Sequence, residues 1–231
     1  MIRGSLLTLL TLISCNTGAK SYIGIDVSHH QGRIHWEEVA KEKIDFVYIK
    51  ATEGATYIDP YFHYNMKGAT DAGFLVGAYH YFRMTSSASE QFDNFKSALK
   101  GYTLSLVPMI DVETSDGKSV GELQDSLNVF IKLLKEEYGC PPMIYGTQRS
   151  YNSYCAPIYN NYHLYIGRYG PNEPVIKGNG TYTIWQYTEE ATVRGIPKPV
   201  DMCKFNSKYS LLNIKRTISG LQRSMHRHQS L

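Results

Sequence analysis

Two carboxylic acids, Asp111 and Glu113, stand two residues apart at the end of the apolar run 106–112. Side chains at positions i and i+2 of a β-strand project from the same face, so both acids would enter one cavity with their backbones roughly 7 Å apart. Two acids this close resist ionising together, so one pKa rises while the other acid stays charged. A proton donor beside a charged carboxylate is what cleavage of a glycosidic bond requires. Taken alone, the Asp-Val-Glu string is equally typical of a turn after a strand.

Polar and aromatic side chains also occur where the other apolar runs end. The acids among them are Asp26 in the first run and Asp201 in the last. The runs between these two end on Lys50 and Glu53, on Tyr79 and Tyr81, on Tyr145, and on Trp185 with Gln186. Buried carboxylates are unfavourable unless they are paired, so a purely structural protein has no reason to gather them at one rim. Acids between aromatic walls, which stack on sugar rings, favour a saccharide cleft.

Several of these residues have a second interpretation. Core packing explains Tyr79 and Tyr145 about as well as a role in the wall of a cleft. Glu53 fits an ion pair with Lys50, or with another cation at the mouth of the fold, as well as it fits a fifth acid of the site. Two adjacent histidines at residues 29–30 would face opposite ways and have no evident third ligand, so we expect loop histidines, with neither a metal nor another cofactor.

The elements that would position these side chains alternate along the chain. Apolar, β-branched and tyrosine-rich runs predict strands at residues 22–27, 44–51, 74–82, 106–112, 142–145, 162–168, 182–187 and 199–204. Helices are predicted at residues 36–43, 60–71, 89–99 and 121–138. Alternation of this kind implies a parallel sheet, and without a dinucleotide-binding glycine motif it favours a closed barrel. We therefore predict one α/β domain, an irregular β/α barrel with its chemistry at the carboxyl ends of the strands.

Charge is distributed unevenly along the 231 residues. Residues 1–20 and 206–231 carry seven basic side chains and no acid, so the remaining residues 21–205 have a net charge of 3 − 7 = −4. A mildly acidic core excludes nucleic acid as its ligand, because phosphate binding needs a basic face. The basic segment 207–231 would be either a helix that touches anionic surfaces or a solvated end, and the second is favoured.

The first twenty residues have the order of a secretory signal: Arg3, an apolar run at residues 6–13, and then Ser14 and Cys15. The run is too short to span a bilayer. Residues 12–15 resemble a bacterial lipobox, which predicts an exported protein anchored through a lipid on Cys15. An ordinary signal with a chance cysteine, and hence a secreted protein, is the alternative.

Three cysteines remain beyond this segment, namely Cys140, Cys155 and Cys203. An odd number permits at most one disulfide, and Cys140 with Cys155 is the nearer pair. Their spacing is not that of a metal site.

Five ordered motifs between residues 22 and 206 resemble the glycoside hydrolase family 25 lysozymes, the Chalaropsis-type muramidases. They are residues 24–28 with 31–32, residues 48–54, residues 77–82, residues 111–113, and residues 185–187 followed by Asp201. The resemblance implies a flattened β/α barrel that cleaves the β-1,4 bond between N-acetylmuramic acid and N-acetylglucosamine. It also implies that Asp26, Asp111, Glu113 and Asp201 line the groove, with the glycan strands of peptidoglycan as partner and a monomer as the default state.

Two positions depart from the family's pattern. Cys203 stands where relatives commonly have asparagine, and Tyr165-Ile166-Gly167 replaces the usual tryptophan-bearing strand. The acids are intact, so these changes affect the lining of the cleft rather than the class of reaction.

A mechanism follows as a hypothesis from the shared strand of Asp111 and Glu113. Both acids approach a sugar from similar directions, which favours Glu113 as general acid, with Asp111 steadying the substrate's own 2-acetamido group, over a covalent glycosyl-enzyme. Asp26 and Asp201 would then position sugar hydroxyls or tune the pKa of Glu113.

Two rival functions are open to the sequence. A chitinase of the other substrate-assisted barrel family needs aspartates where this chain has Leu106 and Met109, which argues against it. A catalytically weak or silent peptidoglycan-binding lipoprotein on the same barrel is the alternative from another class, although all four acids are present.

Overall fold

The computed structural model describes residues 21–216, so the predicted signal segment, Cys15 and residues 217–231 lie outside the described part of the chain. Eight strands form the barrel: β1 (Ile23–Val27), β2 (Phe46–Glu53), β4 (Leu75–Tyr81), β5 (Met109–Asp111), β6 (Met143–Thr147), β7 (Leu164–Gly167), β8 (Ile184–Ala191) and β9 (Val200–Phe205). They confirm the eight predicted strands. A short β3 (Tyr57–Ile58) pairs with β2 as a hairpin and was not predicted.

The strands follow the order β1-β9-β8-β7-β6-β5-β4-β2, and pairing of β1 with β2 closes the ring. The expectation of a wholly parallel sheet was wrong for β9, which is antiparallel to both β1 and β8. Only residues 192–199 join β8 to β9, and a parallel return needs a crossover of a dozen residues or more. The reversal puts the start of β9 at the barrel end where the other strands finish.

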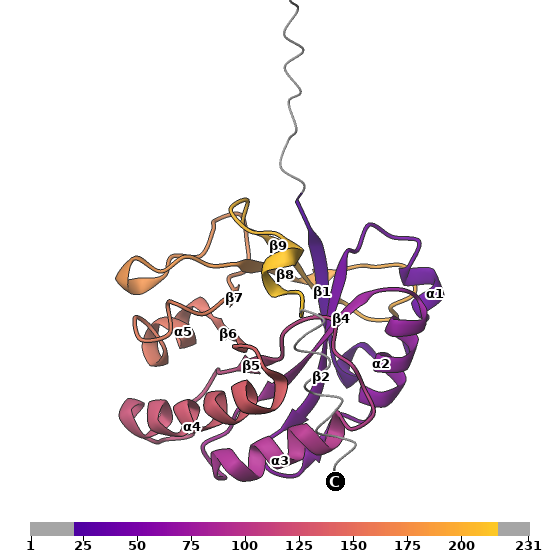
Figure 1. Ribbon diagram of the computed structural model, residues 1–231. Helices are drawn as coiled ribbons and strands as arrows, with labels where there is room; N and C mark the ends of the chain where they lie inside the picture. Colours follow the sequence, from indigo (N-terminus) through magenta and orange to yellow (C-terminus); the bar gives the residue numbers. More distant parts are fainter. Residues whose placement is uncertain (1–20, 217–231) are drawn as a thin grey trace, which may run out of the picture.

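The helices cover the barrel unevenly. They are α1 (Trp36–Val39), α2 (Phe62–Asp71), α3 (Ala88–Ala98), α4 (Val120–Tyr138), the unpredicted α5 (Gln148–Tyr154) and α6 (Leu211–Ile214), with 3₁₀ turns η1 (His29–Gln31) and η2 (Lys177–Asn179). In Figure 1, α1 to α5 surround the strands from β1 round to β6, and loops take their place beside β7 and β8. The predicted irregularity of the barrel is thus confirmed.

Local sequence explains where the two main helices begin. The side chains of Ser87 and Ser119 each accept a hydrogen bond from the backbone N–H three residues further on. The glutamate at that position accepts a hydrogen bond from the backbone N–H of the serine, which completes a capping box. Gly139 ends α4 with a φ of 69°, a left-handed conformation that glycine adopts without strain. The apolar faces of α3 and α4 pack on the outer side of the strands.

Strand alternation divides the apolar residues into two layers. Ile25, Val47 and Ile110 point outward and pack beneath the helices. Phe46, Tyr48, Met109, Tyr145, Tyr165 and Cys203 point inward and fill the barrel. The inward layer lies beneath the polar residues at the mouth of the barrel.

The folded domain extends beyond residue 206, so the predicted boundary was too early. The N–H of Val107 donates to the carbonyl of Ile214, and the N–H of Arg216 donates to the carbonyl of Ser105. Ile214 is fully buried with the inner cluster, so these residues close the barrel end away from the acids. Within the described part, Cys140, Cys155 and Cys203 are free thiols, and the disulfide considered from the sequence does not form.

Gly77 provides a test of the interior packing. A Cβ at Gly77 would lie 2.3 Å from the ring of Tyr48 on the neighbouring strand, well inside contact distance. We expect Gly77→Ala to lower the free energy of unfolding by about 2 kcal/mol, because a full barrel cannot absorb the added atom. Gly121→Ala, where α4 leaves open space, is the control and should be neutral or stabilising. Urea denaturation of both variants decides this, and equal stabilities would contradict a tightly packed interior.

Candidate active site

The structure brings the four predicted acids together at one mouth of the barrel. Asp26 ends β1 and lies directly opposite Asp201 in the antiparallel pair of β1 and β9. Asp111 ends β5, with Tyr81 and Tyr145 as its partners on the two flanking strands. Glu113 follows β5 on the same face as Asp111. The charge of Asp26 acts to raise the pKa of each of the other three acids, so the four form one electrostatic cluster, called here the acid cluster.

Burial and the charges of neighbouring acids raise the pKa of both acids at the end of β5. Burial raises the pKa of Asp111 well above its ordinary value, and the charge of Glu113 raises it further, while Lys50 opposes both. Burial and then Asp26 raise the pKa of Glu113, again against Lys50. Asp111 is only 6 % exposed, whereas Glu113 is half-buried. Glu113 is therefore the member of the pair that can pass a proton to a ligand.

One oxygen of Asp111 is left without a partner. Its Oδ1 is buried and accepts no hydrogen bond from any described residue. Such an atom usually costs stability, and its retention is typical of a functional site.

Asp26 is held more firmly than the other acids. The hydroxyl of Tyr165 donates to its Oδ2 at 2.5 Å, and Nε2 of Gln186 donates to both carboxylate oxygens at 3.0 and 3.2 Å. Gln186 is itself fixed by the hydroxyl of Tyr145, which donates to its Oε1 at 2.8 Å. Burial raises the pKa of Asp26 to about 6, and the bonds from Tyr165 and Gln186 limit that rise.

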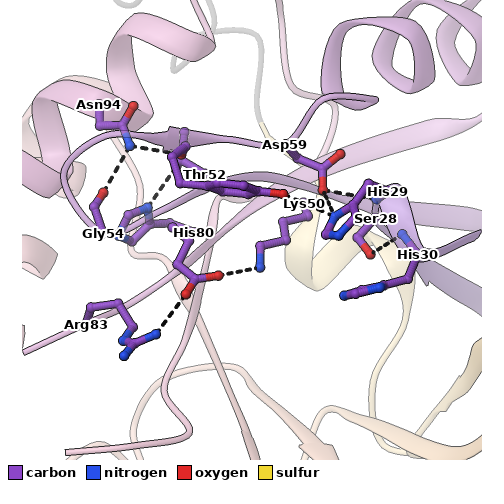
Figure 2. A network of polar contacts seen from close by, with 12 residues as sticks. Ser28, His29, His30, Lys50, Thr52, Gly54, Asp59, His80, Arg83 and Asn94 are labelled. Atoms are coloured by element: carbon purple, nitrogen blue, oxygen red, sulfur yellow. Dashed lines mark hydrogen bonds and ion pairs between the residues drawn. The ribbon is translucent and has the colours of Figure 1, made fainter. Parts of the chain in front are cut away.

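A network of ion pairs around Lys50 and Arg83 lies beside the acid cluster, and Figure 2 shows these two side chains within it. Glu53 accepts from Lys50 at 2.8 Å and from Arg83 at 2.8 Å, and Arg83 also binds both oxygens of Asp116 at 3.0 Å. Partial burial acts to raise the pKa of Glu53, but the two cations outweigh it and lower the pKa. The ion-pair interpretation of Glu53 is therefore the one that the structure supports.

A cavity of about 680 Å³ adjoins this network. Its lining comes from the turn after β1, the β2–β3 hairpin and the segment after β4, and includes His29, His30, Lys50, Tyr57 and Arg83. Asn94 on α3 holds the hairpin in place, because its Nδ2 donates to the carbonyls of Gly54 and Tyr57. Lys50 connects this cavity with the acid cluster, because it lines the cavity and its charge acts to lower the pKa of Asp111 and of Glu113.

The tyrosines predicted as cleft walls lie around the acid cluster. Burial and the charges of Asp26, Asp111 and Asp201 raise the pKa of Tyr79 well above its ordinary value. Tyr81 stands between two cations, with Nζ of Lys50 at 5.0 Å and the guanidinium of Arg83 at 5.9 Å from its ring centre.

Trp185 does not occupy the position predicted for it. It alternates with Gln186 on β8, so its side chain points out of the barrel and is only 3 % exposed. Its indole N–H donates to the carbonyl of Arg168 at 2.6 Å, and Lys204 lies 4.5 Å over its ring. The predicted wall role of Trp185 is corrected accordingly, because alternation along the strand puts Gln186 in the site instead.

Sequence reasoning missed several residues of the site. Tyr169, after β7, is 47 % exposed, and its hydroxyl lies 3.4 Å from Oε1 of Gln186. Tyr165 could have been found as an inward position of its strand, since it alternates with outward apolar residues. Gln186 was noted beside Trp185 at the end of its run, and it is the inward member of that pair. No comparable signal marks Arg83 or Asp116, which come from loops.

The adjacent histidines are loop residues in η1, as predicted. Nδ1 of His29 lies 2.7 Å from Oδ2 of Asp59, a fully buried carboxylate that also accepts the backbone N–H of His29. Among residues 21–216, no three His, Cys, Asp or Glu side chains are grouped so that they could hold a metal ion. Within the same range, no helix combines the length and the apolar composition needed to cross a bilayer.

The acid cluster should make the fold less stable as the pH rises. Burial and the charge of Asp26 raise the pKa of Asp201 to about 8, above its usual 3.8. The folded state therefore binds this proton more tightly than the unfolded state, so the stabilisation is complete below pH 4 and is lost up to pH 8. We expect the Tm to fall by about 5 °C or more between pH 5 and pH 8.

Asp201→Asn should remove much of this slope, whereas Asp93→Asn, at an exposed position on α3, should retain it. Thermal unfolding followed by circular dichroism across this range provides the measurement. A Tm that is constant or rises with pH would contradict the sign.

A closed β/α barrel with a cluster of acids and tyrosines at the carboxyl ends of its strands is typical of a glycoside hydrolase. Residues 25–196 match the model of glycosyl hydrolases family 25, and the chain belongs to that family. The predicted resemblance and the predicted class of enzyme are thereby confirmed.

Individual relatives agree with this assignment. The chain is 35 % identical over 188 residues to the uncharacterized protein YegX of Escherichia coli strain K12, covering 79 % of this chain and 69 % of YegX. It is 33 % identical over 204 residues to lysozyme M1 of Streptomyces globisporus, covering 82 % and 69 % of the two chains. A family 25 glycosyl hydrolase from Bacillus anthracis superimposes with a TM-score of 0.74 at 31 % identity, covering 80 % of this chain and 88 % of the other.

Proposed function

We propose that the protein hydrolyses the β-1,4 bond between N-acetylmuramic acid and N-acetylglucosamine in bacterial peptidoglycan, with Glu113 as general acid. The observation that carries the proposal is the pair at the end of β5: a half-buried Glu113 with a raised pKa beside a buried Asp111. Relatives named lysozyme and N,O-diacetylmuramidase support the choice of substrate.

In the proposed reaction, Glu113 gives its proton to the glycosidic oxygen as the bond to the muramic acid C1 breaks. The oxygen of the substrate's own 2-acetamido group attacks C1, and the ionised form of Asp111 stabilises the positive charge that develops on that group. The deprotonated Glu113 then takes a proton from water, which opens the cyclic intermediate and retains the configuration at C1. The common direction of Asp111 and Glu113 supports this path, because a covalent route needs a nucleophile on the other face of the sugar.

Other members of the mouth bind the glycan in this proposal. The charged form of Asp26 accepts a hydrogen bond from a sugar hydroxyl and raises the pKa of Glu113. Asp201, opposite Asp26 on β9, positions a second sugar hydroxyl. Tyr79, Tyr81, Tyr145 and the exposed Tyr169 provide rings and hydroxyls to the sugars. The cavity beside Lys50 and Glu53 takes the substituents that the glycan carries.

The remaining predictions concern the setting of the reaction. We propose an exported protein, either secreted or held at the cell envelope by a lipid on Cys15, that acts as a monomer on glycan strands and needs no cofactor. The alternative is a catalytically weak or silent peptidoglycan-binding lipoprotein. None of the site features described above favours this alternative directly.

Digestion of purified peptidoglycan tests the proposal. The soluble fragments are identified by mass, and their reducing ends are identified after borohydride reduction. Fragments that end in N-acetylmuramic acid are expected. Fragments that end in N-acetylglucosamine would replace the muramidase by a glucosaminidase, and a folded protein that binds the wall without cutting it would favour the silent binding protein.

A further inference from the structure

The two positions at which the sequence departs from the family's pattern meet inside the barrel. Tyr165 on β7 and Cys203 on β9 are both fully buried, and the thiol of Cys203 interacts with the hydroxyl of Tyr165. The same hydroxyl donates to Oδ2 of Asp26 at 2.5 Å. The departures are therefore one connected feature, and it ends on a carboxylate of the acid cluster.

The hydroxyl of Tyr165 has little freedom to point elsewhere. Its ring packs edge-on against Tyr48 at 6.2 Å and against Tyr145 at 5.3 Å between ring centres. A fully buried hydroxyl bonded to a carboxylate must donate, since an ionised carboxylate offers only acceptors. Gln186 provides the second donor, so both oxygens of Asp26 are engaged from the barrel interior.

We infer that Tyr165, supported by Cys203, is a positioning residue that fixes the orientation and the charge of Asp26 for the proposed hydrolysis. Removal of the hydroxyl leaves Asp26 buried with one donor fewer, which favours its neutral form. Both roles proposed for Asp26, accepting from a sugar hydroxyl and raising the pKa of Glu113, need the charged form. The inference thus rests on the proposed function for its effect on activity, but not for its effect on Asp26 itself.

The effect on the pH profile has a definite sign. Burial already raises the pKa of Asp26 to about 6, and the bond from Tyr165 lowers it. Loss of that bond should raise the pKa further, so the acid limb of the activity profile moves upward. The alkaline limb reports Glu113, whose own contacts the substitution leaves in place, so this limb should not move.

Such a substitution leaves the other titratable groups near Asp26 in place, although Cys203 loses its contact with the removed hydroxyl. Those that face Asp26 are Asp201 and Cys203 on β9, Asp111 and Glu113 from β5, Tyr79 on β4, Tyr145 on β6 and Tyr169 after β7. A shift seen on removing one hydroxyl therefore belongs to Tyr165.

Tyr165→Phe is the test, and Tyr48→Phe is its matched control. Tyr48 is also a fully buried tyrosine of the barrel interior, but its hydroxyl donates to the carbonyl of Val107 rather than to an acid. Two readouts are needed on the full chain: the pH profile of peptidoglycan cleavage, and the titration of Asp26 by ¹³C NMR of labelled aspartate carboxyls, assigned with Asp26→Asn. The second readout does not depend on activity.

For Tyr165→Phe we expect an upward shift of about one pH unit in both the acid limb and the titration of Asp26, with the alkaline limb unchanged. Tyr48→Phe should move neither. An unchanged titration of Asp26 in folded Tyr165→Phe, or an equal shift in Tyr48→Phe, overturns the inference. If Tyr165→Phe does not fold, Cys203→Ala takes its place, where a smaller upward shift supports the inference and no shift overturns it. A protein that cleaves no peptidoglycan would refute the proposed function while the titration still decides the role of Tyr165.

Discussion

Glu113→Gln is expected to lower the rate of peptidoglycan cleavage by about 10³-fold or more, because glutamine cannot donate the proton that the leaving oxygen needs. The fold should remain intact, since glutamine has the shape of the protonated acid that burial already favours at this position. The measurement is the initial rate of release of reducing ends near the pH optimum, together with the Tm of the variant.

The matched control is Glu136→Gln on the exposed surface of α4, where the carboxylate lies 3.9 Å from Lys132 in a weak ion pair. Its rate and its Tm should equal those of the parent protein. If Glu113→Gln keeps more than a tenth of the parent rate, another acid of the cluster donates the proton, and the role assigned to Glu113 is withdrawn. A large fall in the Tm would instead attribute the lost activity to misfolding.

Asp111→Asn is expected to change activity and stability in opposite directions. The rate should fall by about 10²-fold or more, because a neutral amide cannot stabilise a cation on the substrate's acetamido group. Stability should rise, because the substitution removes a buried acid that has an unpartnered oxygen and is repelled by Glu113 and Asp26. An increase of about 1 kcal/mol in the free energy of unfolding at pH 8 is a reasonable size for this relief.

Activity assays and urea denaturation at pH 8 measure the two effects, with Asp125→Asn on the exposed face of α4 as control. An Asp111→Asn variant that is both inactive and less stable would mean that Asp111 is needed for the fold and would leave its catalytic role without support. A stable variant with parent activity would rule out the substrate-assisted role directly.

Much of the fold follows from local sequence patterns. The apolar runs predicted eight strands because burial on both faces leaves long β-branched and aromatic stretches. The predicted helix 121–138 differs from α4 by one residue at its start, since a serine cap and a terminal glycine are local signals. The short α5 was missed because its seven residues, rich in tyrosine and serine, have no strong apolar period.

The acids of the site were also visible in the sequence. Asp111 and Glu113 lie on one strand, and their common direction depends only on the alternation of side chains along that strand. Asp26 could be added because parallel strands of a barrel end at the same mouth. The sequence showed less clearly which side chains of a strand point into the barrel. Trp185 was predicted to line the site, but its neighbour Gln186 faces the site instead.

By itself, then, the sequence determined the class of fold, the family and the acids, because these depend on patterns that span a few residues. The tertiary structure alone decided how each acid is held. The donor to Asp26, Tyr165, is 139 residues away along the chain, and Asp201 reaches the mouth only because β9 runs antiparallel to its neighbours. Protonation depends on burial and on such long-range neighbours, which closure of the barrel brings together and no local pattern encodes.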